Sequence, residues 1–317
     1  MLTTILAAER GKERPLLKSA FNNLERVASL PAIQHLEKID LPQVNAFICI
    51  RSIFVESRLS EPCAPYVPSA MNLSLKHFTS DIYSLRNCSL MLFTSLQNRI
   101  FGKAGKSISA RLFFTKYRGV REVLLNFLED SLKKPSDNDQ GFVLSQSRVE
   151  SIFLVLNLLL RLRPTPGYDG LDIFIEKVTH CLESPHWNIR EMAAKTISSL
   201  TDDPLDQFEA LLSTASITRQ NKLHGHLLAA KAIMSDKRDV LEEKKAGTRI
   251  FELLYSMKLL TNNPCFVTSK EYIEAVEYVL SWKNTIAHAK KDFVARLGNF
   301  FLYHNERYSI AVSYTHL

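Results

Sequence analysis

A cluster of basic residues carries the clearest chemical signal in this chain. No Asp or Glu occurs between Ile82 and Arg121, whereas eight Lys and Arg residues do. These are Arg86, Arg99, Lys103, Lys106, Arg111, Lys116, Arg118 and Arg121. The net charge of the whole chain is +7, so this segment holds the entire excess and leaves the remainder near −1. Concentrated cations neutralise phosphates, which predicts that a polyanion binds here.

Aromatic residues alternate with these cations. Phe113, Phe114 and Tyr117 lie among Arg111, Lys116 and Arg118. An exposed ring can stack on an unpaired base, but aromatic rings in proteins are usually buried. We therefore expect the two phenylalanines in the core and the charges on a positive face that an RNA could use. The neighbouring Arg86 and Asn87 have apolar flanks, so a hydrogen-bonding role between helices and contact with a ligand both stay open.

The other candidate chemistry in the sequence is weak. Residues 102–107 look like a phosphate-binding loop but lack its spacing and a preceding strand, so a basic connector is expected. His224 with His226, and His180 with Cys181 and His186, lack the spacing of a metal site, and a structural role is expected for both groups. No glycine-rich dinucleotide fingerprint or nucleophile elbow occurs. The sequence therefore predicts no catalytic residues, no metal and no cofactor.

Helices must position the basic segment, because the chain is poor in turn residues. It has 10 Gly and 12 Pro in 317 residues, and 46% of its residues are hydrophobic. Helical periodicity predicts helices near 15–29, 43–59, 69–79, 82–101, 108–116, 119–132, 143–162, 169–183, 186–200, 204–214, 219–235, 239–260, 269–282 and 284–303. No strand pair is expected. Helix pairs about 40 residues long predict an all-α, HEAT/armadillo-like α-solenoid, with an irregular bundle as the alternative.

Composition also bears on the compartment. The five cysteines are odd in number and widely spaced, which disfavours a disulfide framework and favours a reducing compartment. The longest apolar run, 152–160, is shorter than a bilayer crossing requires. We therefore expect a soluble cytoplasmic protein without a membrane partner.

Several ordered blocks of sequence resemble a known family. Leu41–Phe54, Leu85–Gly102, Phe113–Tyr117, Trp187–Ala194 and Asn221–Leu228 occur in this order. They resemble the central domain of the THADA family of giant HEAT/armadillo-like proteins, with fungal members the most similar, over about residues 5 to 235. Fungal members are the non-catalytic partners of a methyltransferase that modifies a ribose 2′-oxygen in the tRNA anticodon loop. Because family members are much longer, the resemblance implies that this chain is an internal fragment.

The resemblance implies a non-catalytic scaffold or regulatory subunit that presents tRNA to a partner methyltransferase. The residues expected to contact RNA phosphates are Arg99, Lys103, Lys106, Arg111, Lys116, Arg118 and Arg121; Arg86, Asn87, Arg190 and His224 are expected at a partner or RNA surface. A protein–protein adaptor of the transport or assembly type, with no RNA role, is the alternative function. The expected organisation is a basic helical half at 1–133, a flexible loop at 134–142, further helical repeats at 143–304 and a non-native or disordered tail at 305–317.

Overall fold

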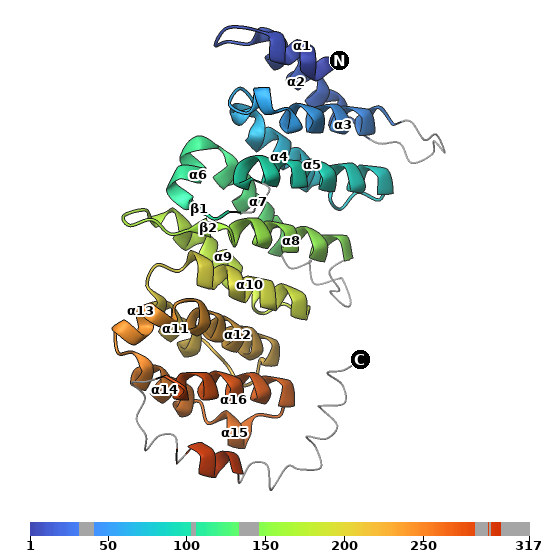
Figure 1. The fold of residues 1–317 in the computed structure, drawn as a ribbon. Coiled ribbons are helices and arrows are strands. Elements are labelled where there is room, and N and C mark those ends of the chain that lie inside the picture. The colour runs from blue at the N-terminus through green and yellow to red at the C-terminus, as the bar shows by residue number, and fades with distance from the viewer. Residues whose placement is uncertain (32–40, 103–105, 133–145, 283–290, 292, 299–317) are drawn as a thin grey trace. The chain divides into compact units, whose positions relative to one another are not determined.

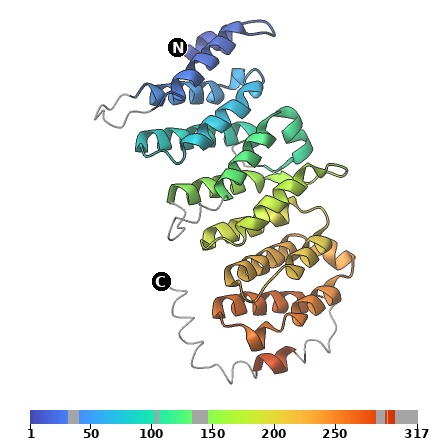
Figure 2. The same ribbon diagram turned by 180° about the vertical axis from the view of Figure 1, so that it is seen from behind.

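The computed structural model describes residues 1–317 except 32–40, 103–105, 133–145, 283–290, 292 and 299–317. The chain divides into two compact units, Met1–Phe174 and Ile175–Leu317. Within each unit, α-helices stack side by side (Figure 1), and the reverse view shows the same stacking (Figure 2). The expected loop at 134–142 and tail at 305–317 lie outside the described residues, so the domain boundaries predicted from the sequence stay predictions.

The first unit contains eight helices and the start of a ninth among its described residues. They are α1 (Leu2–Ala8), α2 (Pro15–Ala28), α3 (Pro42–Val55), α4 (Val67–His77), α5 (Tyr83–Phe101), α6 (Ala110–Lys116), α7 (Val120–Leu132), α8 (Gln146–Leu159) and α9 (Asp172–Cys181), the last continuing into the second unit. Short 3₁₀ helices η1 (Ser57–Leu59), η2 (Ala64–Tyr66) and η3 (Asp169–Leu171) connect them.

Two rows of helices bury a shared core in this unit. Helix α3 packs against α2 and α5, while α4 packs against α5 and α7. Phe47 and Ile50 on α3, with Leu92, Phe93 and Leu96 on α5, are fully buried. Their spacing of three or four residues places them on one side of each helix, which is why these apolar stretches fold as helices.

The second unit repeats this arrangement. Its helices are α10 (Trp187–Leu200), α11 (Pro204–Ser213), α12 (Gln220–Asp236), α13 (Arg238–Glu243), α14 (Gly247–Ser256), α15 (Leu259–Asn262) and α16 (Phe266–Leu280). Helix α12 lies between α10 and α16 and packs against both, while α11 packs against α12, α13 and α14. Gly225 allows α12 to approach the end of α9 closely, because a Cβ atom there would lie 2.1 Å from the carbonyl oxygen of Leu182.

The fold is an all-α solenoid, as the sequence predicted. Three local expectations were wrong. The helix expected at 239–260 is broken into α13, α14 and α15, α1 was not expected, and β1 (Ile108–Ser109) pairs in parallel with β2 (Leu162–Arg163). The helix expected at 284–303 lies largely outside the described residues. None of the described helices has the length and apolar character needed to cross a membrane.

Candidate nucleic-acid interface

Three cations of the basic segment are exposed around α6. Lys106 precedes β1, Arg111 lies in the first turn of α6, and Arg118 lies in the turn between α6 and α7. The side chain of Ser109 caps α6 by accepting a hydrogen bond from the Leu112 amide at 3.5 Å. Lys103 lies outside the described residues. The exposed cations therefore come from one short helix and the two turns that flank it.

Buried aromatic rings anchor α6 beneath these cations. The ring of Phe113 lies 6.1 Å from that of Phe101, and the ring of Phe114 stacks on that of Phe174 at 5.6 Å. Tyr117 is also buried, and burial raises the pKa of its hydroxyl. The expectation that the phenylalanines belong to the core is confirmed. Since these rings are buried, α6 is anchored to the core and carries Arg111, while Lys106 and Arg118 lie in the segments on either side of it.

Two other basic residues of the segment bond to other parts of the fold, Arg99 from a half-buried position and Lys116 at the surface. Arg99 donates from Nε to the carbonyl oxygen of Phe54 at 2.7 Å and from Nη2 to that of Glu56 at 2.7 Å. Both carbonyls lie at the end of α3, where carbonyl groups run out of partners within the helix, so Arg99 caps that helix, and the Glu56 carbonyl also accepts from the Leu59 amide at 3.1 Å. Lys116 pairs with Glu61 at 2.9 Å, and this hydrogen bond raises the pKa of Lys116. Lys116 is therefore paired with an acidic residue that lies outside the basic segment of the sequence.

Arg121, Arg86 and Asn87 lie in three different environments. Arg121 is half-buried, and its charge acts to lower the pKa of Tyr168, although burial of that hydroxyl raises it overall. Arg86 donates from Nη1 to the carbonyl oxygen of Ser80 at 2.6 Å, which joins it to the loop before α5. Asn87 is exposed on α5. Of the two, Arg86 thus has a structural contact and Asn87 presents its side chain to solvent.

The short strand pair adds cations that the sequence pattern did not single out. The parallel pairing aligns Ile108 with Leu162 and Ser109 with Arg163, and the hydroxyls of Ser109 and Thr165 lie 2.7 Å apart. Arg161 therefore lies beside the segment that begins at Lys106, with its guanidinium 5.4 Å from the Phe101 ring. A run of Arg-Leu-Arg directly after an apolar helix was the available sequence signal. That these arginines lie next to β1 became known only from the strand pairing in the structure.

Arg190 and His224 do not lie on the surface, which corrects the expectation for both. Their exposed fractions are 7% and 2%. Arg190 donates to the carbonyl oxygens of Ser184 and Pro185 at 2.7 and 3.0 Å and from Nε to Nδ1 of His224 at 3.3 Å. Burial lowers the pKa of Arg190 and, together with the charge of Arg190, lowers that of His224 to about 4. These buried groups hold α10 to α12.

The histidine and cysteine candidates have structural surroundings. His226 is turned away from His224 and its Nδ1 lies 2.7 Å from the carbonyl oxygen of Leu211. No group of three or more His, Cys, Asp or Glu with metal-site geometry occurs in the part of the chain that the structure describes. Burial raises the pKa of the Cys88 thiol, and it raises the pKa of the Cys181 thiol to about 12, so both thiols are protonated at neutral pH. A protonated, buried thiol is a poor nucleophile.

These observations define a helical-repeat protein with a local basic surface. A family model described as THADA/TRM732, DUF2428 matches residues 1–84, and one described as Trm732, C-terminal TPR repeats, matches residues 86–233. The chain belongs to the THADA/Trm732 family. The TPR description differs from the HEAT/armadillo type expected from the sequence, but both are stacks of helix pairs.

Curated relatives carry the same family name. The tRNA (32-2′-O)-methyltransferase regulator trm732 of Schizosaccharomyces pombe is 28% identical over 92% of this chain and 20% of its own length. The tRNA (32-2′-O)-methyltransferase regulators THADA of mouse and human are each 30% identical over 94% of this chain and 16% of their own length. The chain thus spans about a fifth or less of the relatives it matches. Among solved structures, an engineered protein covers 82% of the chain at 17% identity with a TM-score of 0.33.

Proposed function

We propose that this chain is a non-catalytic part of a tRNA methyltransferase regulator, and that its basic surface holds tRNA for a partner methyltransferase in the cytoplasm. The observation that carries the proposal is the exposed cluster of Lys106, Arg111 and Arg118 in a chain whose relatives are named regulators of tRNA 2′-O-methylation. The partner enzyme would supply the active site and the methyl donor.

The geometry favours contact with phosphates over contact with bases. Lys and Arg bind the backbone without reading sequence, whereas sequence-tolerant binding of single strands uses exposed aromatic rings. Here Phe113, Phe114 and Tyr117 are buried. The surface around α6 would therefore fix the position and orientation of the RNA.

The parallel strand pair extends this proposed surface. Arg161 and Arg163 follow α8, more than 40 residues along the chain from Arg118, but β1–β2 pairing places them beside Lys106 and Ser109. A backbone of regularly spaced phosphates needs cations at several points along its path. We therefore include Arg161 and Arg163 in the proposed RNA surface.

The test compares two triple variants of this chain. Lys106→Gln, Arg111→Gln and Arg118→Gln remove three exposed cations around α6, and Arg10→Gln, Lys12→Gln and Lys18→Gln remove three exposed cations near α1 and α2. Binding of a fluorescent anticodon stem-loop RNA is measured by anisotropy at low salt. The first triple variant should bind at least tenfold more weakly, because each bound phosphate contributes separately. Equal affinity of both variants would exclude this surface.

A second measurement separates tRNA binding from the adaptor alternative. The full-length family protein carrying the first triple substitution is tested for capture of the purified methyltransferase and for methylation of tRNA. Intact capture with abolished methylation supports the proposal. Abolished capture with unchanged RNA affinity would instead assign the cations to an acidic protein surface, as the adaptor alternative requires.

A further inference from the structure

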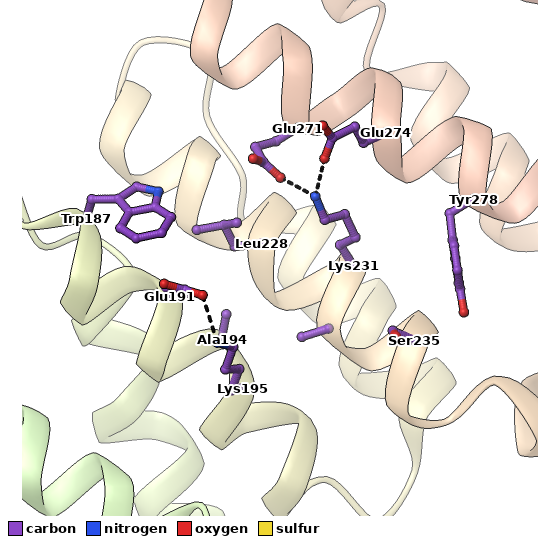
Figure 3. A pocket seen from close by; sticks show the side chains of 11 residues that line it. Trp187, Glu191, Ala194, Lys195, Leu228, Lys231, Ser235, Glu271, Glu274 and Tyr278 are labelled. Atoms are coloured by element: carbon purple, nitrogen blue, oxygen red, sulfur yellow. Dashed lines mark hydrogen bonds and ion pairs between the residues drawn. The ribbon is translucent and has the colours of Figure 1, made fainter. Parts of the chain in front are cut away.

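A groove in the second unit crosses three neighbouring helices and plays no part in the proposed RNA surface. Its volume is about 450 Å³. It is lined by Trp187, Glu191, Ala194 and Lys195 from α10, Leu228, Lys231, Ala232 and Ser235 from α12, and Glu271, Glu274 and Tyr278 from α16 (Figure 3). Ligand sites typically have volumes of roughly 300–1,000 Å³, so one or two side chains of a partner can enter.

One end of the groove is formed by a tryptophan in the first turn of α10. Ile189, Ala193 and Ile197 of the same helix are buried, whereas Trp187 is 49% exposed. Within the described residues, Trp187 stacks on no ring and meets no cation. A tryptophan face is the best side-chain surface for a guanidinium, and tryptophans are enriched where binding energy concentrates.

Glu191 lies one helical turn beyond Trp187, on the same side of α10. Its carboxylate pairs with Lys195 at 2.7 Å, a further turn along (Figure 3). The Lys195 side chain is 54% exposed, and exposed ion pairs of this kind contribute little to stability. An arriving cation with better geometry can therefore take the place of Lys195 with little loss of stability.

The opposite wall is also acidic. Lys231 lies between Glu271 and Glu274 of α16 and bonds the Oε2 atom of each, at 2.6 and 2.5 Å (Figure 3). The lining thus has three carboxylates against two ammonium groups. Lys270 also pairs with Glu274 at 3.8 Å, so the carboxylates of this wall are already matched by cations, and Glu191 is the carboxylate that an arriving cation can reach. Between the walls, Leu228, Ala194 and Ala232 provide apolar surface.

The other aromatic residue of the lining, Tyr278, already has a guanidinium group beside its ring. Arg238 lies 5.8 Å from the centre of the Tyr278 ring and pairs with Glu242 at 2.8 Å. The same combination, an aromatic face beside a carboxylate, recurs at Trp187 and Glu191. Among the described residues, no arginine occupies the position beside Trp187 and Glu191.

We propose that this groove binds a segment of a partner protein that carries an arginine next to an aliphatic residue. The guanidinium stacks on Trp187 and bonds Glu191 in place of Lys195, and the aliphatic side chain packs against Leu228. Arginine fits better than lysine because its planar fork can stack on a ring and bind a carboxylate with two hydrogen bonds at once. The inference does not depend on tRNA binding by the first unit.

Trp187 itself reports the binding. The chain has two tryptophans, and the other, Trp282, is buried. In a Trp282→Phe background, emission is recorded while the capped peptide Ala-Leu-Arg-Leu-Ala is added, beside the same peptide with Gln or Glu at the centre and the anticodon stem-loop RNA. The arginine peptide should give a saturable change, the glutamine peptide should bind at least fivefold more weakly, and the glutamate peptide should not saturate.

Two substitutions on α10 make the test independent of folding losses. Glu191→Gln should weaken the arginine peptide at least fivefold. Lys195→Ala should instead strengthen it about two- to fivefold, because the competing ion pair is removed. Equal binding of the arginine and glutamate peptides, or saturation by the RNA but not by the arginine peptide, would overturn the proposal. So would an unchanged affinity in both variants.

Discussion

At the scale of single residues, the most consequential side chain is a buried arginine that pairs with no carboxylate among the described residues. Arg190 bonds two backbone carbonyls before α10, the side-chain oxygen of Asn221 at 3.3 Å and the ring of His224. Because Arg190 donates to Nδ1, that nitrogen must carry a lone pair, so His224 is neutral with its proton on Nε2. The contact between α10 and α12 thus requires a charged arginine and an uncharged histidine together.

This requirement predicts a pH dependence of stability. The unfolded chain protonates His224 near its ordinary pKa of 6.5, whereas in the fold the pKa is about 4. Between these values the unfolded state binds more protons, so the free energy of unfolding falls as pH decreases, by at most about 3 kcal/mol from this residue. Denaturant unfolding between pH 7.5 and 4.5 measures it.

The matched variant is His224→Gln, which has no titrating ring. Its unfolding free energy is expected to be lower than that of the unaltered chain at pH 7.5, but to decline less between pH 6.5 and 4.5. Parallel declines in the two proteins would show that His224 does not titrate differently in the folded state.

At the scale of elements, the approach of α12 to the end of α9 depends on one glycine. Replacing a helical glycine by alanine normally stabilises a helix by about 1 kcal/mol. At Gly225 the sign should reverse, because the added Cβ would meet the Leu182 backbone oxygen and force the helices apart. We expect Gly225→Ala to lower the free energy of unfolding by about 1–3 kcal/mol or more.

The control for this substitution lies in the same unit. Gly298 is helical, and a Cβ there would have no atom within 4 Å. Gly298→Ala should leave the unfolding midpoint unchanged or raise it slightly. A decrease of similar size in both variants would mean that the destabilisation does not come from the close helix approach.

The sequence predicts elements well where local chemistry marks them and poorly where it does not. Helix α11 begins at Pro204 after the capping carboxylate of Asp203, and its predicted and observed ends agree within one residue. The break after α13 falls at Lys245, which has a left-handed φ of 53°. Glycine normally occupies that conformation at a helix end, so a lysine provided no signal to stop.

In the candidate site, too, the sequence could predict some features and not others. Burial of Phe113 and Phe114 follows from their residue type alone, and was predicted. The partners of Lys116 and Arg99 lie 55 and 43–45 residues away in sequence, so spacing could not reveal them. Arg190 was assigned to the surface because a charged residue on a helix is usually exposed. The carbonyls and the histidine that stabilise it in the interior become visible only when α10 and α12 are packed.

At the scale of the whole molecule, the charge distribution predicts how binding responds to salt. Binding of phosphates releases counterions, so the affinity for RNA should fall steeply as salt rises. Removing Lys106, Arg111 and Arg118 together should reduce the slope of log affinity against log salt by about 2–3, roughly one for each cation removed. Anisotropy titrations at a series of salt concentrations measure the slope.

The comparison is again the triple variant at Arg10, Lys12 and Lys18, which has the same net charge. Its slope should stay close to that of the unaltered chain. Identical slopes for both variants would indicate that overall charge governs the attraction, and that no particular phosphates are held around α6.

The stacked rings beneath α6 have a consequence for selectivity. Phe101, Phe113, Phe114 and Phe174 turn their faces and edges toward one another. An RNA strand crossing this surface as proposed would meet exposed cations, while the buried rings of Phe113 and Phe114 would offer its bases nothing to stack on. Such a surface would bind according to the spacing and curvature of the RNA backbone and not according to its base sequence. Its affinity for different tRNAs would therefore be similar, and selection among tRNAs would depend on protein groups that contact the anticodon bases.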